Sequence, residues 1–269
     1  MAKDGQWQIG DNAAEFYEKI PSRYILGPWA PGLVESSNLK PDERVLDIAC
    51  GTGVVTREAA AKLEPTGAIT GLDLNAGMIE YAKSLGNPGS GKLDYVAASA
   101  LDLEFSDETF DVVLCQQGLQ FFPDQPKALS EALRVLAPNG RARFSVWAAR
   151  GPYNDAVGAA IGRGIDYATA TRYFASRNVP TPEALNSMFD EAGFRDVVLE
   201  RVEMQVRLPD IEKFVAAHLR GTPVAAEFEA LPKSEQDALA KDAANGMAAY
   251  ADGVDVVVPD FSNIVAAVK

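Results

Sequence analysis

The stretch VLDIACGTG, residues 45–53, places a carboxylate, Asp47, shortly before a Cys-Gly-Thr-Gly turn that ends an apolar run. In an open α/β sheet, ligands bind at the carboxyl ends of the strands, and the turn after the first strand lies there. A second carboxylate, Asp73, stands about 20 residues after Gly51, where an acidic side chain is the usual acceptor for two ribose hydroxyls. These residue types at this spacing predict a site for a ligand that contains a ribose.

The turn itself favours a cationic ligand over a dinucleotide. The dinucleotide fingerprint G-x-G-x-x-G requires a third glycine for close helix packing, and here that position is Thr56. A pyrophosphate needs bare backbone N–H groups and positive potential, whereas Asp47 puts a negative charge close to the turn. An amino-acid ammonium group fits such a turn. Because Asp73 also suits a dinucleotide, this distinction depends on Asp47 and Thr56 together.

The elements that must position these residues form an alternating pattern over residues 44–148. Short β-like runs alternate with stretches that repeat apolar residues at helical spacing, which is typical of βαβ units on a parallel sheet. The Pro138-Asn139-Gly140 turn is expected to close the last of these helices before the fifth strand. The predicted strands are residues 44–49, 68–74, 92–98, 110–116 and 141–148.

Three further segments are predicted around this core, which we place at residues 39–150. Residues 1–38 are expected to form an N-terminal helical cap, because apolar residues share one helical face over residues 11–20. Residues 151–269 are expected to complete the sheet, with strand-like runs at 195–206 and 256–268. Lid insertions are predicted at about 151–180, as a short helix and a loop, and at about 209–250, as helices.

Composition limits the partners. A formal net charge of −13 disfavours nucleic acid, since binding to phosphates relies on Lys and Arg, and it favours a small-molecule substrate. The sequence has no run of about 18 apolar residues, so no membrane span is predicted, and the N-terminus lacks the apolar segment of a signal peptide. Two cysteines, Cys50 and Cys115, cannot form a disulfide framework and are interpreted as packing residues. We therefore expect a cytoplasmic protein without membrane association or a metal site.

Four segments together resemble a known family. VLDIACGTG, GLDLNAGMIEYAK, ASALDLEFSDETFDVVLCQQGLQFFPD and ALSEALRVLAPNGR, in this order, are similar to class I S-adenosylmethionine-dependent methyltransferases. The likeness is strongest to the ubiquinone and menaquinone biosynthesis branch, and it covers about residues 40–148. It implies an α/β, Rossmann-like, doubly wound and mostly parallel sheet of seven strands with an antiparallel last strand and helical lids. It also implies S-adenosylmethionine as the cofactor.

The resemblance places the methionine part of S-adenosylmethionine over the glycine turn. Asp47 would support its ammonium group, and Gln116 and Gln117, at the end of the fourth strand, would reach the methionyl end. The turn residues that would pass under the methionine are Cys50, Gly51, Thr52 and Gly53.

The ribose and adenine are implied to bind beyond the second strand. Asp73 would hold the ribose hydroxyls. Ser99 stands where the family often has an acidic residue, and Asp102 is a candidate to replace it at the adenine amino group. The residues implied to contact the adenine are Leu74, Met78, Ser99, Ala100 and Leu101.

The substrate pocket is predicted from the cap and the lids. Many relatives carry histidines just after the fourth strand, but this chain has none there, and His218 is its one histidine. His218 falls on an apolar helical face, so it is interpreted either as a packed residue under the lid or as a pocket residue and candidate catalytic base. The predicted pocket residues are Tyr17, Tyr24, Trp29, Gln120 and His218.

These observations predict methyl transfer to an O, N or C atom of an apolar or aromatic small molecule by in-line displacement. Two alternatives stay open at this point. One is a catalytically inactive protein that binds S-adenosylmethionine, and the other is an NAD-dependent oxidoreductase on a similar sheet. The sequence does not distinguish a monomer from a homodimer and does not identify the acceptor atom.

Overall fold

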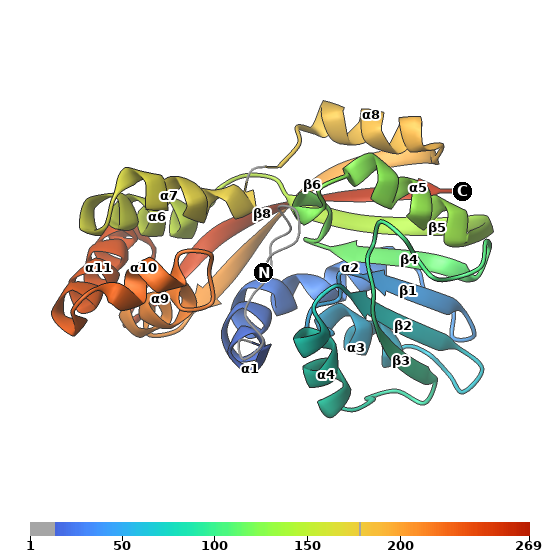
Figure 1. The fold of residues 1–269 in the computed structure, drawn as a ribbon, viewed down its shortest axis with the longest axis horizontal. Helices are drawn as coiled ribbons and strands as arrows, with labels where there is room; N and C mark the ends of the chain where they lie inside the picture. The colour runs from blue at the N-terminus through green and yellow to red at the C-terminus, as the bar shows by residue number, and fades with distance from the viewer. Residues whose placement is uncertain (1–13, 178) are drawn as a thin grey trace.

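The computed structural model describes residues 14–177 and 179–269, and its centre is a mixed sheet (Figure 1). The strand order is β3-β2-β1-β4-β5-β8-β6, and β8 runs antiparallel to both of its neighbours. A two-residue strand, β7 (Ala251–Asp252), also pairs with β8 and adds to the seven strands predicted. The seven are β1 (Arg44–Ile48), β2 (Ala68–Asp73), β3 (Lys92–Ala97), β4 (Phe110–Gln116), β5 (Leu136–Trp147), β6 (Arg195–Leu208) and β8 (Asp255–Val268). The predicted Rossmann-like fold is confirmed.

Helices cover both faces of the sheet because its central strands are apolar on both sides. In β1, Val45 packs toward α2 and α3, whereas Leu46 packs toward α5 and α8. Successive side chains of a strand point to opposite faces, and strands buried on both faces are typical of parallel sheets. The core helices are α2 (Ala30–Ser36), α3 (Val54–Ala60), α4 (Ala76–Ser84), α5 (Gln125–Val135) and α8 (Pro182–Ala192).

The fifth strand begins earlier than the sequence pattern predicts. Helix α5 ends at Val135, and the next residue, Leu136, is fully buried and already pairs with Phe110 of β4. The Pro138-Asn139-Gly140 segment therefore lies inside β5 as an irregularity in the register, with Asn139 at a φ of 61°. Burial of Leu136 against the sheet explains why the strand starts before the turn residues.

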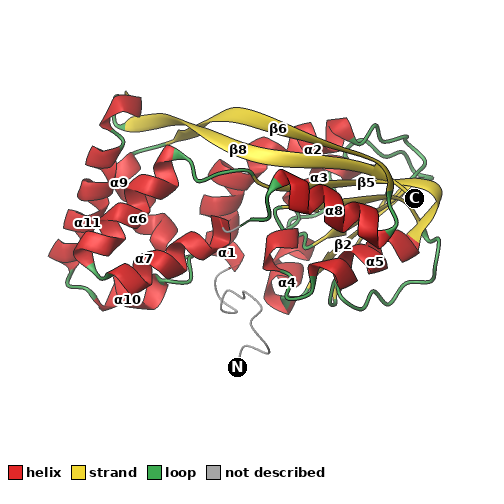
Figure 2. Ribbon diagram, turned by 90° about the horizontal axis from the view of Figure 1, so that it is seen from above, coloured by secondary structure: helices red, strands yellow, loops and turns green. Residues whose placement is uncertain are grey.

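Strands β6 and β8 are long, and one end of their ribbon carries a second group of helices (Figures 1 and 2). Apolar residues of this end, including Val206 and Val258, belong to one core cluster with residues from these helices. The two segments predicted as separate lids therefore pack together as a single helical body. Its helices are α6 (Pro152–Gly164), α7 (Tyr167–Phe174), α9 (Ile211–Leu219), α10 (Ala225–Ala230) and α11 (Lys233–Gly246). The first lid contains two helices, where one helix and a loop were expected.

The N-terminal segment lies between the core and the helical body (Figure 1). It consists of α1 (Ala14–Tyr17), the π-helical turns of η1 (Glu18–Leu26) and the short η2 (Gly27–Trp29), which leads into α2. The part of the predicted cap before Ala14 lies outside the described residues. Among the described residues, no helix is long and apolar enough to cross a membrane.

Candidate active site

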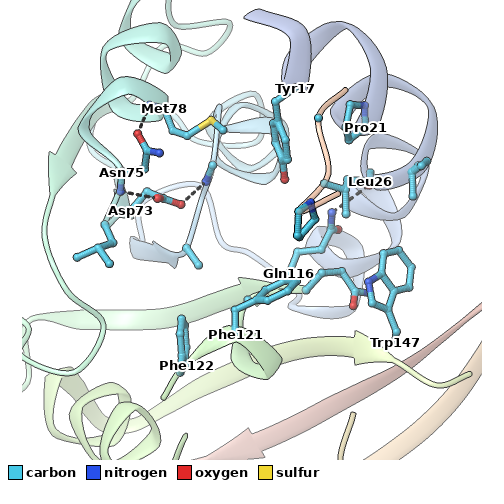
Figure 3. Close-up of a pocket in the computed structure, with 18 of the residues that line it drawn as sticks. Tyr17, Pro21, Leu26, Asp73, Asn75, Met78, Gln116, Phe121, Phe122 and Trp147 are labelled. Atoms are coloured by element: carbon cyan, nitrogen blue, oxygen red, sulfur yellow. Dashed lines mark hydrogen bonds between the residues drawn. The ribbon is translucent and has the colours of Figure 1, made fainter. Parts of the chain in front are cut away.

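A cavity of about 220 Å³ opens at the carboxyl ends of β1, β2 and β4, between the core, the N-terminal segment and the helical body (Figure 3). This is the position at which an open α/β sheet is expected to bind its ligand. The residues that line it are Tyr17, Pro21, Ile25, Leu26, Ala49, Gly51, Leu72, Asp73, Leu74, Asn75, Met78, Ser99, Ala100, Leu101, Gln116, Gln117, Gly118, Phe121, Phe122, Trp147, Asn154, Tyr173, Arg177, His218, Gly221, Thr222 and Pro223.

The glycine turn is fixed by backbone conformation and by Asp73. Gly51 and Gly53 have φ values of 56° and 86°, in the left-handed region that favours glycine. The Asp73 carboxylate accepts hydrogen bonds from the backbone N–H groups of Gly51 and Asn75, each at 2.9 Å. Figure 3 draws them as dashed lines from Asp73. Asp73 therefore joins the turn after β1 to the end of β2, and it also lines the cavity.

Asp47 lies beneath the turn and does not line the cavity. Its side chain is 1% exposed and accepts a hydrogen bond of 2.5 Å from the hydroxyl of Thr56. Burial raises the pKa of Asp47 to about 7. Thr56, which stands where the dinucleotide fingerprint has its third glycine, thus holds Asp47 in place through this hydrogen bond. Because Asp47 and Val45 are two residues apart in one strand, their side chains share the face that α3 covers.

The N-terminal segment is tied over the glycine turn by an ionic contact that the sequence did not reveal. Arg57 forms an ion pair with Glu18 at 2.7 Å, and the hydroxyl of Thr52 donates to the same carboxylate at 2.5 Å. Tyr17 covers Gly51, where an added Cβ would lie 3.3 Å from the ring carbon Cε1. We call Glu18, Arg57 and Thr52 the N-terminal clasp. Thr52 is buried within this clasp and does not line the cavity.

Two glutamine side chains at the end of β4 present buried carbonyl oxygens. Gln116 donates from Nε2 to the Leu26 carbonyl at 2.9 Å, and Gln117 donates from Nε2 to the Ser262 hydroxyl at 3.0 Å. Their Oε1 atoms are buried and have no hydrogen-bond partner within residues 14–177 and 179–269. Gln117 also has a φ of 55°, a strained conformation of the kind found at functional sites. Both residues line the cavity, so it is bordered by two side chains whose acceptor oxygens are unpaired in the described chain.

The far wall of the cavity contains a buried cation. The Arg177 side chain is 7% exposed, pairs with Asp260 at 2.8 Å and stacks over the Trp147 ring at 3.7 Å from its centroid. Sequence reasoning did not single out these three residues. Nothing in the local pattern connects Arg177 with Asp260, because 83 residues separate them and only the packing of the helical body on β8 brings them together.

His218 lines the same wall and is hydrogen-bonded. Its Nδ1 atom lies 2.7 Å from the hydroxyl of Tyr153. Burial, together with the positive charge of Arg177, lowers the pKa of His218 to about 4. The imidazole is therefore neutral near pH 7. Both features anticipated from the sequence, a packed helical face and a place in the pocket, are present in this residue.

Four other predicted residues lie outside the cavity wall. Trp29 stands behind it, packed edge-on against Trp147, and Tyr24 packs edge-on against Phe214 of α9. Gly53 faces Tyr95, since a Cβ at that glycine would lie 2.4 Å from the tyrosine oxygen. Cys50 is buried beside α4 and Tyr95.

Gln120 also lies outside the wall, although its neighbour Phe121 lines the cavity. The predicted residues that do line it are Tyr17, Gly51, Asp73, Leu74, Met78, Ser99, Ala100, Leu101, Gln116, Gln117 and His218. Within the described part of the chain, no cluster of three or more His, Cys, Asp or Glu side chains could hold a metal ion.

The sequence of this chain is similar to those of known methyltransferases. A family model described as a methyltransferase domain matches residues 46–144. The chain is 30% identical over 209 residues to the demethylmenaquinone methyltransferase of Symbiobacterium thermophilum. The aligned residues cover 70% of this chain and 83% of that enzyme. It is 34% identical over 217 residues to a ubiquinone/menaquinone biosynthesis C-methyltransferase of Xanthomonas oryzae, covering 72% of this chain and 84% of that enzyme.

Solved structures share the fold at lower sequence identity. The phosphoethanolamine N-methyltransferase 2 of Haemonchus contortus, solved with S-adenosylhomocysteine, superposes with a TM-score of 0.61 and 19% identity, over 96% of this chain and 57% of that chain. The 4+2 cyclase SpnF superposes with a TM-score of 0.57 and 20% identity, over 100% of this chain and 88% of that chain. At these identities, the likenesses establish the shared fold and nothing further.

Proposed function

Because the chain belongs to the class I S-adenosylmethionine-dependent methyltransferases of the ubiquinone and menaquinone biosynthesis branch, we propose that it methylates a planar aromatic small molecule held between its core and its helical body. The enzyme class, the small-molecule substrate and S-adenosylmethionine as the cofactor follow from this membership. The observation that carries the proposal is the single cavity that joins the glycine turn to the aromatic far wall among the described residues.

The residues at the near end fit the amino-acid part of the cofactor. Gly51 presents bare backbone beneath Tyr17, and the Oε1 atoms of Gln116 and Gln117 are buried acceptors that lack a partner in the described chain. An ammonium group carries three donors and can satisfy such oxygens. Leaving them unpaired would cost about 1–3 kcal/mol each. We therefore assign the cofactor ammonium to these two glutamines.

Asp73 is the proposed partner of the ribose hydroxyls, and the adenine would lie beyond it. A carboxylate has about four lone-pair sites, and the two backbone N–H groups leave acceptor capacity on Asp73 toward the cavity. The residues proposed to surround the adenine are Leu74, Met78, Ser99, Ala100 and Leu101, all of which line the cavity.

Asp47 has an indirect role in this proposal. Its hydrogen bond to Thr56 and its burial keep it beneath the turn, so we assign it to positioning the turn and the first residues of α3. Contact between Asp47 and the ammonium group, implied by the resemblance, is replaced by contact with Gln116 and Gln117.

The chain's own residues would align the acceptor and exclude water. When bound, the cofactor supplies the methyl group and a positive leaving group that becomes neutral. Methyl transfer by in-line displacement needs alignment and a dry site more than strong acid-base chemistry. Tyr17 closes the cavity on the side of the turn, and Phe121, Phe122 and Trp147 form apolar walls for a flat ring. A planar ring is consistent with the quinone methyltransferases among the relatives.

Calorimetry tests the proposal. S-adenosylhomocysteine should bind with micromolar affinity, whereas NADH should give no binding heat. A panel of hydroxyaryl compounds and quinols should then include at least one acceptor that S-adenosylmethionine methylates. Tight NADH binding would refute the cofactor assignment, and cofactor binding without turnover of any acceptor would favour an inactive binding protein. Cytoplasmic location, a monomeric or dimeric state and the segment boundaries at residues 38 and 150 stay predictions.

A further inference from the structure

His218 and Tyr153 form a buried hydrogen-bonded pair at the far wall. The phenol oxygen of Tyr153 lies 2.7 Å from Nδ1 of His218, and Tyr153 is 6% exposed. The His218 ring also lies against Phe214, with centroids 5.9 Å apart and nearly parallel planes. These contacts come from α6 and α9, so the ring is held by two elements of the helical body.

The direction of this hydrogen bond follows from what each group can donate. A neutral imidazole has one N–H donor and one acceptor nitrogen, and a phenol has one O–H donor. If Nδ1 carried the proton, the buried Tyr153 O–H would have no acceptor among the described residues, since its hydrogen bond to His218 is the one it makes there. An unsatisfied buried donor is costly. The stable arrangement is therefore Tyr153 O–H donating to Nδ1, with the imidazole proton on Nε2.

The protonated Nε2 is then the atom that His218 can offer to a ligand. His218 lines the cavity, and Nε2 has no hydrogen-bond partner within residues 14–177 and 179–269. The pKa of about 4 keeps the ring neutral near pH 7. A neutral imidazole whose second nitrogen already carries a proton can donate a hydrogen bond from that nitrogen but cannot accept a proton there.

The groups that face this pair favour an electron-rich ligand oxygen. Arg177 is the nearby cation, and it is held by Asp260, while Tyr153 and Tyr173 are the neutral titratable groups beside it. Burial raises the pKa of both tyrosines, so neither becomes a phenolate near neutral pH. The wall thus combines an N–H donor with the Arg177–Asp260 ion pair, whose guanidinium also acts on His218, so it fits a ligand oxygen that accepts a hydrogen bond.

We propose that Tyr153 holds His218 in the Nε2–H tautomer and that His218 donates a hydrogen bond to an ionised oxygen, an enolate or phenolate, of the acceptor substrate. This inference rests on the proposed methyl transfer and narrows its substrate class. An oxygen held there as an anion would supply the electron pair with which the acceptor carbon or oxygen binds the methyl group, and the bond between that methyl group and sulfur would break as the new bond forms. The sulfur would leave as a neutral thioether, and an acceptor carbon would then lose its ring proton to solvent. His218 then acts on the substrate as a hydrogen-bond donor, and Tyr153 is a positioning residue.

The tautomer can be measured directly because the chain contains one histidine. Nitrogen-15 NMR of the untagged, histidine-labelled chain at pH 7.5 should show a neutral ring with its proton on Nε2. Tyr153→Phe should convert this to a mixture of tautomers. The matched control is Tyr24→Phe, because Tyr24 contacts the same Phe214 ring at the same 5.7 Å centroid distance but does not bond His218. A wild-type proton on Nδ1, or equal effects of the two variants, would overturn the assignment.

Two probes test the substrate class in the presence of S-adenosylhomocysteine. The first is 2-hydroxy-1,4-naphthoquinone, whose acidic enol is ionised at neutral pH, and the second is its neutral 2-amino counterpart. The enolate should bind about tenfold more tightly, the effect of one charge-assisted hydrogen bond. His218→Ala should remove the preference, and His218→Gln, which keeps an N–H donor, should restore part of it. Absence of a preference for the enolate in the wild type would overturn the proposed oxygen anion.

These results separate the inference from the proposed function. A chain that binds S-adenosylhomocysteine and methylates an acceptor but carries the proton on Nδ1 would refute the inference alone. A chain with the Nε2–H tautomer that binds no S-adenosylhomocysteine would refute the proposed function, and the proton assignment of His218 would stand.

Discussion

Replacement of Gly53 by alanine tests the geometry of the glycine turn. Gly53 has a φ of 86°, and an added Cβ would lie 2.4 Å from the Tyr95 oxygen and 3.0 Å from two of its ring carbons. Tyr95 has little room to move, because its ring also packs closely against Gly71, where an added Cβ would lie 2.7 Å from two ring carbons. The substitution therefore combines an unfavourable backbone conformation with a steric overlap against a confined ring.

The two costs can be estimated separately. A left-handed conformation costs a non-glycine residue about 1–2 kcal/mol, and overpacking a well-packed site costs about 1–3 kcal/mol. Gly53→Ala should therefore lower the free energy of unfolding by about 2–5 kcal/mol. Gly86 provides the matched control, since its φ is 77° and nothing lies within 4 Å of its Cβ position. Gly86→Ala should cost about 1–2 kcal/mol, from backbone strain alone.

Urea unfolding followed by circular dichroism measures both variants against the wild type. Combining Gly53→Ala with Tyr95→Phe should recover part of the loss, because the phenol oxygen is the closest atom to the new methyl group. Equal destabilisation by Gly53→Ala and Gly86→Ala would refute the argument that Tyr95 confines the turn. A double variant no more stable than Gly53→Ala would assign the overlap to the ring carbons instead of the oxygen.

Three further substitutions test the site. Asp73→Ala should weaken S-adenosylhomocysteine binding in calorimetry by about 2–4 kcal/mol, the loss of two charge-assisted hydrogen bonds; binding within threefold of wild type would place the ribose elsewhere. Glu18→Gln breaks the ion pair of the N-terminal clasp and should speed cofactor dissociation in stopped-flow measurements, whereas Glu15→Gln, which breaks the exposed pair with Lys19, should not. Because the pKa of Asp47 is raised to about 7, the folded state keeps a proton on this carboxyl between about pH 4 and pH 7, whereas the unfolded state has lost it. The protonated Asp47 therefore contributes to stability at low pH, and this contribution is lost as the pH rises through about 7. As the pH rises from about 4 to 7, Asp47→Asn should therefore become more stable relative to wild type. A difference in the free energy of urea unfolding that stays constant from pH 5 to 8 would contradict the raised pKa of Asp47.

The sequence by itself determined the core of this protein, because that information is local. Short β-like runs alternating with stretches of helical period predicted the parallel strands, and the glycines at 51 and 53 with Asp73 located the cavity at the strand ends. The strand period of two would also have placed Asp47 on the same face as Val45. Had that alternation been combined with the helical position of Thr56, the buried hydrogen bond between Asp47 and Thr56 could have been anticipated.

Tertiary structure decided the rest of the site, because its contacts join residues that no short-range pattern connects. The two predicted lids became one helical body only because β6 and β8 extend together and bury its apolar faces. That packing brings Arg177 to Asp260 and Tyr153 to His218, across 83 and 65 residues of chain. Hydrogen-bond direction and the pKa of His218 depend on burial and on neighbouring charge, which exist only once the chain is folded.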